Sequence, residues 1–285
     1  MILVTGAAGK TGKAIISALA SRGAVVRAFV HRREYTQDVF SLGAHEVVVG
    51  NMLDPHAFNH AVLGCRAVYH ICPNVDPNEF AIGNIAIEAA AAAGIEHFVY
   101  HSVLHPHIEA MPHHWQKMRV EELLFNAHLP FTILQPTAYM QNITAQWQSI
   151  SETGIYTVPY PLETQTALVA LEDVAAAAAI VLTQPGHLAA TYELCGPDNL
   201  NQTEIAALIS AHLSRPVRAE RLPISLWVQR AKTSGMGSYQ IETLVKMFRY
   251  YETSGLPGNP KALSHLLGHP PVSFTAFIQN QFPNT

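Results

Sequence analysis

The sequence predicts an α/β fold built on a doubly wound parallel sheet, followed by a smaller, mostly helical C-terminal domain. Two observations lead to this prediction. Short apolar runs alternate with helix-length segments through the first half of the chain, and those runs are apolar throughout instead of alternating with polar residues. Strands with this pattern are buried on both faces, as they are when helices cover both sides of a parallel sheet.

Each element follows from its apolar pattern and its flanking residues. The expected strands are residues 2–5, 24–30, 46–49, 67–71, 97–101 and 131–134. The expected helices between them are residues 11–21, 35–41, 55–63, 78–93 and 114–127, the first stopped by Gly23. Crossover connections of this length join parallel neighbours in one sheet.

The regular alternation of strands and helices becomes weaker after about residue 135. A loop rich in Gly, Pro and Thr is expected over residues 151–166, then a helix at 175–179, a strand at 191–195 and helices at 203–210 and 238–251. We therefore expect a first domain over residues 1–150 and a smaller substrate-side domain over residues 151–285. A strand and helix near residues 167–195 should return to the first domain.

Composition limits the possible functions. The 285 residues are 49% hydrophobic and 13% charged, which is enough to bury a large core. A net charge of -4 without a basic block disfavours nucleic acid as a partner. The apolar run at 86–93 is too short to span a membrane, and no leader precedes residue 2. Cys65, Cys72 and Cys195 show no CxxC spacing, so a reducing, cytoplasmic setting is expected.

A glycine-rich turn provides the strongest local signal. The segment VTGAAGKTG lies directly after the first strand and opens the first helix. In such a turn the glycines permit the bend, the close approach of a pyrophosphate and tight helix packing, while helix N–H groups face the anion. This context predicts a dinucleotide site of the Rossmann type rather than an ordinary βα turn. Its candidate residues are Gly6, Ala8, Gly9, Lys10, Thr11 and Gly12.

The GxxGxxG spacing resembles the extended and atypical short-chain dehydrogenases/reductases. The segments 113–124, 131–142 (FTILQPTAYMQN), 170–175 and 266–274 together resemble the NmrA-like family over nearly the whole chain. This resemblance implies an NAD(P)-binding protein. It implies either a reductase of quinones or other small electrophiles, or a regulator that senses redox state through a protein partner without turnover.

The second strand ends in His31, Arg32 and Arg33, where proteins that prefer NAD usually carry an acidic residue. A cation here suits a 2'-phosphate, so NADP(H) is the favoured cofactor and NAD(H) remains possible. Arg32 is the first candidate for the phosphate, with His31 or Arg33 in support. The alternative is a solvated basic turn.

Further cofactor contacts are expected at the carboxyl ends of the later strands. Asn51 and Met52 follow the third strand, where the family contacts adenine, while Asp54 is expected only to cap a helix. The fourth strand ends in Cys72, Pro73 and Asn74. Pro136 follows the sixth strand, on the side expected to cover the nicotinamide.

The family resemblance also implies catalytic candidates. Related reductases place a tyrosine four residues before a lysine, and a serine after the preceding strand. Here the lysine is Lys117, which should bind the nicotinamide ribose, but the position four residues earlier is His113. His113 is either a proton shuttle or a surface helix cap. Ser102 occupies the place of the serine, or only a turn.

Mixed aromatic and apolar residues are expected beside the substrate. They are Tyr139, Met140 and Tyr156, and such a lining suits a flat, uncharged small molecule. The alternative for Tyr139 and Met140 is that they only close a core. The 16 histidines lack the spacing of a zinc site, so no metal is expected.

Overall fold

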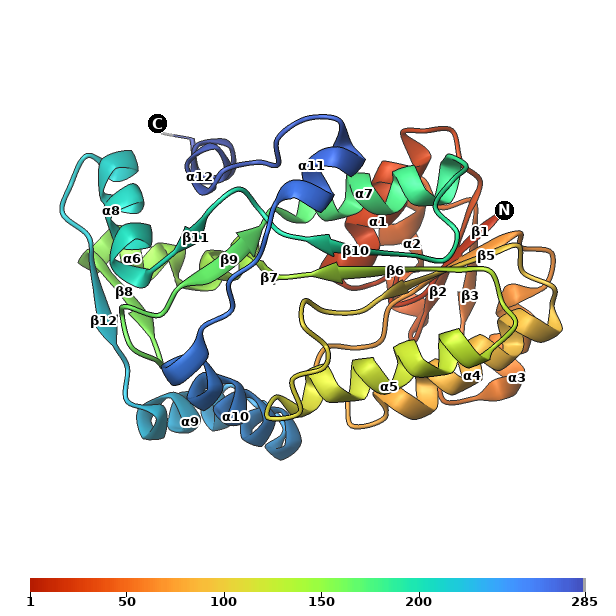
Figure 1. The fold of residues 1–285 in the computed structure, drawn as a ribbon, viewed down its shortest axis with the longest axis horizontal. Helices are drawn as coiled ribbons and strands as arrows, with labels where there is room; N and C mark the ends of the chain where they lie inside the picture. The colour runs from red at the N-terminus through yellow and green to blue at the C-terminus, as the bar shows by residue number, and fades with distance from the viewer. Residues whose placement is uncertain (284–285) are drawn as a thin grey trace. The chain divides into compact units, whose positions relative to one another are not determined.

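Seven strands form one sheet in the computed structural model, which describes residues 1–283 (Figure 1). They are β1 Ile2–Val4, β2 Val26–Val30, β3 Glu46–Val49, β4 Ala67–His70, β5 His97–His101, β6 Phe131–Pro136 and β10 Ala190–Leu194. Their order is β10-β6-β5-β4-β1-β2-β3, and every pairing from β3 to β6 is parallel. The predicted doubly wound parallel sheet is confirmed.

Helices cover both faces of this sheet. Figure 1 shows α3, α4 and α5 on one side and α1, α2 and α7 on the other. Their bounds are α1 Lys10–Ala20, α2 Thr36–Ser41, α3 Pro55–Val62, α4 Glu79–Ala92, α5 Pro112–Asn126 and α7 Leu171–Thr183, and a short 3₁₀ helix, η1 Arg33–Tyr35, precedes α2. Most expected ends agree to within a few residues. Helix α7 is longer than the predicted 175–179, because Val174 before the alanines and Val181 and Leu182 after them continue the buried face.

The chain packs into two compact units. The first comprises Met1–Ile108, His113–Gln135 and Val174–Tyr192, and the second comprises Glu109–Pro112, Pro136–Asp173 and residues 193–283. The predicted domain boundary at residue 150 stays a prediction.

The second unit combines short strands with helices. A three-stranded sheet has the order β11 Asn199–Leu200, β9 Thr166–Val169, β7 Ala138–Tyr139, and a two-stranded sheet pairs β12 Arg218–Arg221 with β8 Ile155–Val158. The helical elements are η2 Met140–Gln146, α6 Trp147–Thr153, α8 Gln202–Leu213, α9 Ile224–Thr233, α10 Ser238–Ser254, α11 Lys261–Leu267 and α12 Phe274–Gln281.

The prediction of a loop over residues 151–166 is wrong for residues 155–158, which form β8. Tyr156 and Val158 alternate with half-buried neighbours and reach a core, which is the pattern of a half-buried strand. Their partner strand is β12, in which Arg218 pairs with Ile155 across 63 residues of chain. The Gly and Pro content of the segment masked this alternation in the sequence.

Each unit has its own apolar core. In the first, the sheet strands and α3, α4 and α5 pack around Phe58, Phe98 and Val120. In the second, Ile150 and Ile209 pack with Phe274 and Phe277. None of the helices within residues 1–283 is long and apolar enough to cross a bilayer.

Candidate functional site

The sheet has its topological switch point at β1, which lies between β2 and β4. Helical connections leave in opposite directions on the two sides of such a strand, which opens a crevice beyond its carboxyl end. The segments that follow β1 and β4 are tied together here. Thr5 Oγ1 accepts a hydrogen bond from the Ile71 N–H at 2.9 Å and donates to the Ile71 carbonyl at 3.1 Å.

The turn from β1 into α1 carries the three predicted glycines. Gly6 has φ +56°, and a Cβ on it would lie 2.8 Å from Ile71 Cγ2. A Cβ on Gly12 would lie 2.4 Å from the Gly6 carbonyl oxygen. A Cβ on Gly9 would be 3.3 Å from that same oxygen, at an ordinary φ of -75°. Gly6 and Gly12 are therefore required by the turn itself, whereas a Cβ at Gly9 requires the Gly6 oxygen to shift by only a few tenths of an ångström.

The start of α1 suits an anion. Within the described chain, no side chain caps the helix at Gly9, and its first turn carries no acidic residue. Unpaired N–H groups at a helix start favour a negative charge. The remaining loop candidates differ in exposure: Lys10 is exposed, Ala8 is half-buried and Thr11 is buried.

The loop after β2 holds a cationic cluster. Arg32 donates from Nε to His31 Nε2 at 3.1 Å and from Nη2 to the Tyr35 hydroxyl, and its guanidinium lies over the Tyr35 ring. Glu34 approaches Arg32 Nη1 at 3.2 Å. Arg32 is exposed, so the pair with Glu34 is weak and a phosphate can replace it. Arg33 is exposed as well and begins η1.

The later strand ends carry the other cofactor candidates. Asn51 is exposed and its Oδ1 accepts from the Leu53 N–H at 3.0 Å, which leaves its amide NH₂ for a ligand. Met52 is half-buried. Asp54 accepts from the His56 N–H at 2.9 Å at the start of α3, which confirms the predicted cap.

The three candidates in the segment after β4 differ in their exposure to solvent. Pro73 and Asn74 are exposed, and Cys72 is buried. Burial, and after it the nearby Glu79 carboxylate, raises the pKa of the Cys72 thiol, so it is protonated at neutral pH.

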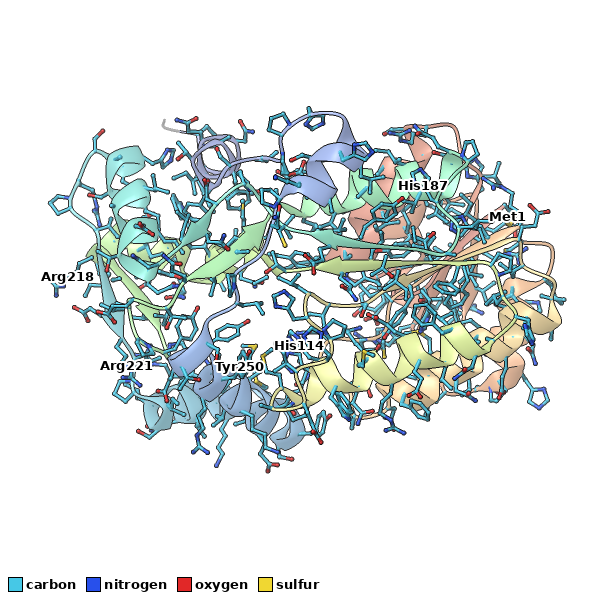
Figure 2. The ribbon with its side chains drawn as sticks, in the orientation of Figure 1. Met1, His114, His187, Arg218, Arg221 and Tyr250 are labelled. Atoms are coloured by element: carbon cyan, nitrogen blue, oxygen red, sulfur yellow. The ribbon has the colours of Figure 1, made fainter. Side chains whose placement is uncertain are left out.

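Lys117 lies in α5, one turn beyond His114, which Figure 2 labels. Its ammonium donates to Glu79 Oε1 at 3.0 Å and to the His101 carbonyl at 3.1 Å, and it lies 5.3 Å from the centre of the Tyr100 ring. All of these groups belong to the first unit. The structure thus holds a fixed, mostly buried positive charge near the end of β5.

His113 is mostly shielded from solvent. Burial, then the neighbouring His114 and Lys117, lowers its pKa to about 3. Its Nδ1 is buried without a hydrogen-bond partner in the described chain, and its ring packs edge-on against His114. A histidine with this pKa is neutral at neutral pH and is a poor base, so the geometry gives little support to a proton shuttle there.

Ser102 is buried directly after β5, and its hydroxyl donates to a Glu121 carboxylate oxygen. Glu121 also accepts from Gln135 Nε2 at 2.9 Å. The hydroxyl proton of Ser102 is therefore already engaged, and its role as a catalytic residue stays a prediction.

The substrate-side candidates belong to the second unit, as does Pro136, which is buried at the end of β6. Met140 and Tyr156 share that unit's core, and the Tyr156 hydroxyl donates to Gln202 Oε1 at 2.9 Å. Tyr139 is half-buried in β7. Contact with a substrate stays a prediction for these residues.

Sequence reasoning missed two residues that the structure places at these sites. Glu79 falls inside the expected helix over residues 78–93 and was not singled out, because an acid near the start of a helix is an ordinary preference. Tyr35 appeared only as the start of the next helix. Their roles depend on Lys117 and Arg32, and the Glu79–Lys117 pair spans too many residues for a local pattern to reveal it. Within residues 1–283, no three His, Cys, Asp or Glu side chains cluster in a way that could hold a metal ion.

The residues fit a dinucleotide. A turn that needs glycine at two positions leads into an uncapped helix start, and an exposed arginine follows the neighbouring strand β2. The fold and this site define a nucleotide-binding protein of the extended Rossmann type. More specifically, the chain belongs to the NmrA-like family, whose model matches residues 1–271.

Several of the relatives are reductases or oxidoreductases by name. The chain is 26% identical to an NAD(P)H azoreductase of Xenophilus azovorans, over 98% of this chain and 97% of that protein. It is 33% identical to a (4-alkanoyl-5-oxo-2,5-dihydrofuran-3-yl)methyl phosphate reductase of Streptomyces griseus, over 84% of this chain and 82% of that one. The structure of an NADPH-dependent quinone oxidoreductase of Escherichia coli, solved with NADPH, matches with a TM-score of 0.87 and 25% identity, over 99% of this chain and 100% of that chain.

Proposed function

We propose that this chain is an NADPH-dependent oxidoreductase that reduces a quinone-like or other small electrophilic substrate. The observation that carries the proposal is the pairing of the Gly6–Gly12 turn after β1 with Arg32 after the neighbouring strand β2. The first suits a pyrophosphate and the second a 2'-phosphate. The azo and quinone reductases among the relatives support the class of substrate.

In this proposal the protein positions the reactants and the cofactor supplies the hydride. The N–H groups at the start of α1 bind the pyrophosphate, Arg32 binds the 2'-phosphate, and Lys117 orients the nicotinamide ribose. Since the lowered pKa keeps His113 neutral, it is a poor proton donor at neutral pH, and we assign it no proton transfer in this reaction. We further propose a cytoplasmic setting, in keeping with three unpaired, buried cysteines, and no nucleic-acid partner, in keeping with the net charge of -4.

The test follows the decay of NADPH absorbance with purified protein and a panel of quinones, enones and azo dyes. A parallel fluorescence titration measures NADPH binding. We expect decay with the wild type and its loss in Lys117→Ala, while Lys261→Ala, an exposed lysine at the start of α11, retains the wild-type rate. Equal rates in all three proteins would remove Lys117 from the mechanism.

A second candidate is a redox-sensing regulator that binds NADP(H) and acts through a protein partner without turnover. The observation that favours it is the neutral His113 in place of the reductase tyrosine. Tight NADPH binding without decay across the whole panel would support this candidate over the reductase.

A further inference from the structure

Glu79 is an acidic side chain held almost entirely inside the first unit, with 3% of its side chain exposed. It lies in the first turn of α4. Its Oε1 accepts two hydrogen bonds, from Lys117 Nζ at 3.0 Å and from the Tyr100 hydroxyl at 2.8 Å. None of the cofactor contacts proposed above involves Glu79.

One N–H donor of the Lys117 ammonium group stays available for a ligand. An ammonium group has three N–H donors. Glu79 and the His101 carbonyl take two of them, and the Tyr100 ring lies beneath the charge. The side chain keeps 16% of its surface exposed. The remaining N–H is therefore aimed by fixed contacts, whereas an unpaired lysine would sample many rotamers.

Glu79 also connects the elements that surround this charge. It joins α4 to β5 through Tyr100 and to α5 through Lys117, and its carboxylate lies within hydrogen-bonding reach of the Cys72 thiol after β4. Removing one partner of such a buried pair leaves the other charge uncompensated. The carboxylate thus determines where the ammonium can lie relative to the ends of β4 and β5.

We propose that Glu79 is the positioning residue for Lys117, which it fixes so that the remaining N–H meets the hydroxyls of the nicotinamide ribose. This inference rests on the proposed NADPH-binding function. It assigns to Glu79 an effect on one half of the dinucleotide only, because the adenosine half is bound by the α1 turn and by Arg32.

The test compares two ligands by fluorescence or calorimetric titration: NADPH, and 2',5'-ADP, which lacks the nicotinamide ribose. Glu79→Gln keeps the shape of the side chain and removes its charge. We expect its affinity for NADPH to fall about tenfold, since a charge-assisted contact is misplaced, and its affinity for 2',5'-ADP to stay within about twofold. Glu88→Gln, an exposed residue of the same helix that bonds Asn84, is the matched control and should match the wild type for both ligands.

A double variant decides whether Glu79 acts through Lys117. In a Lys117→Ala background, Glu79→Gln should cause no further loss of NADPH affinity. Additive losses, equal losses for the two ligands, or no loss for either would overturn the proposal. If Glu79→Gln does not fold, Glu79→Asp, which withdraws the carboxylate by one methylene, is measured in the same way with the same expectations. A wild type that binds neither ligand would refute the proposed function itself, and this inference with it.

Discussion

The carbonyl oxygen of Gly6 lies where a Cβ on Gly12 would come within 2.4 Å of it. The peptide backbone therefore leaves no space for a side chain at Gly12. The atoms nearest to that Cβ are all backbone atoms, which cannot move aside as a flexible side chain could. Gly9 differs, because its added Cβ would lie 3.3 Å from the same oxygen and its φ is ordinary. The two glycines should respond differently to the same substitution.

Gly9→Val is expected to abolish dinucleotide binding, because a side chain at this position prevents the close approach of the pyrophosphate to the backbone. It should change the free energy of unfolding by less than about 1 kcal/mol, since the φ is ordinary and the Gly6 oxygen has to shift only slightly. Gly12→Val should destabilise the protein by about 3 kcal/mol or more through overpacking. Urea unfolding and NADPH titration of both variants measure this. Normal NADPH affinity in Gly9→Val would refute the assignment of the loop.

Arg32→Ala should lower the preference for NADPH over NADH about tenfold, since a charge-assisted contact to the 2'-phosphate is lost. The ratio of the two dissociation constants is the measurement. Glu34→Gln, which frees Arg32 from its carboxylate neighbour, should strengthen NADPH binding slightly. An unchanged ratio in Arg32→Ala would move the phosphate site to His31, Arg33 or Lys10.

His113→Gln should leave the shape of the pH–rate profile unchanged between about pH 6 and pH 8. The reason is that the pKa of His113 is lowered to about 3, so its protonation state does not change in this range. Steady-state rates of NADPH oxidation across the range test the prediction. A wild-type inflection near neutral pH that disappears in the variant would restore His113 as a catalytic acid or base.

His70 should make the protein less stable as the pH falls. Burial lowers its pKa to about 3, from 6.5 for an ordinary histidine, so below pH 6.5 the unfolded chain binds a proton that the folded chain does not. Its contribution to stability is complete above the unfolded pKa and declines by about 1.4 kcal/mol per pH unit as the pH falls through the window between the two values.

The test of this contribution is urea unfolding of His70→Phe at several pH values between 7 and 4. Phe suits the ring neighbours Phe58, Phe98 and Tyr100, although the bond between His70 Nδ1 and Thr5 is lost. The variant should lose stability with acid less steeply than the wild type. His56→Gln, at an exposed histidine of α3, should keep the wild-type slope. Parallel slopes for His70→Phe and the wild type would contradict the assignment.

The strand and helix order of the first unit and the position of the glycine turn could be predicted from the sequence. Apolar runs with both faces buried, the stop at Gly23 and the glycines at 6, 9 and 12 are local signals, each set by backbone geometry within a few residues. The cap at Asp54 is equally local, because its side chain bonds the second residue along the chain.

The partners of the site residues were decided only by the tertiary structure. Lys117 meets Glu79 across 38 residues, Ser102 meets Glu121 through the packing of α5 against the sheet, and β8 forms only because β12 pairs with it. The burial that lowers the pKa of His113 also depends on the tertiary structure. Periodicity and turn chemistry act over one or two turns of chain, whereas hydrogen bonding and desolvation depend on which distant segments the fold brings together.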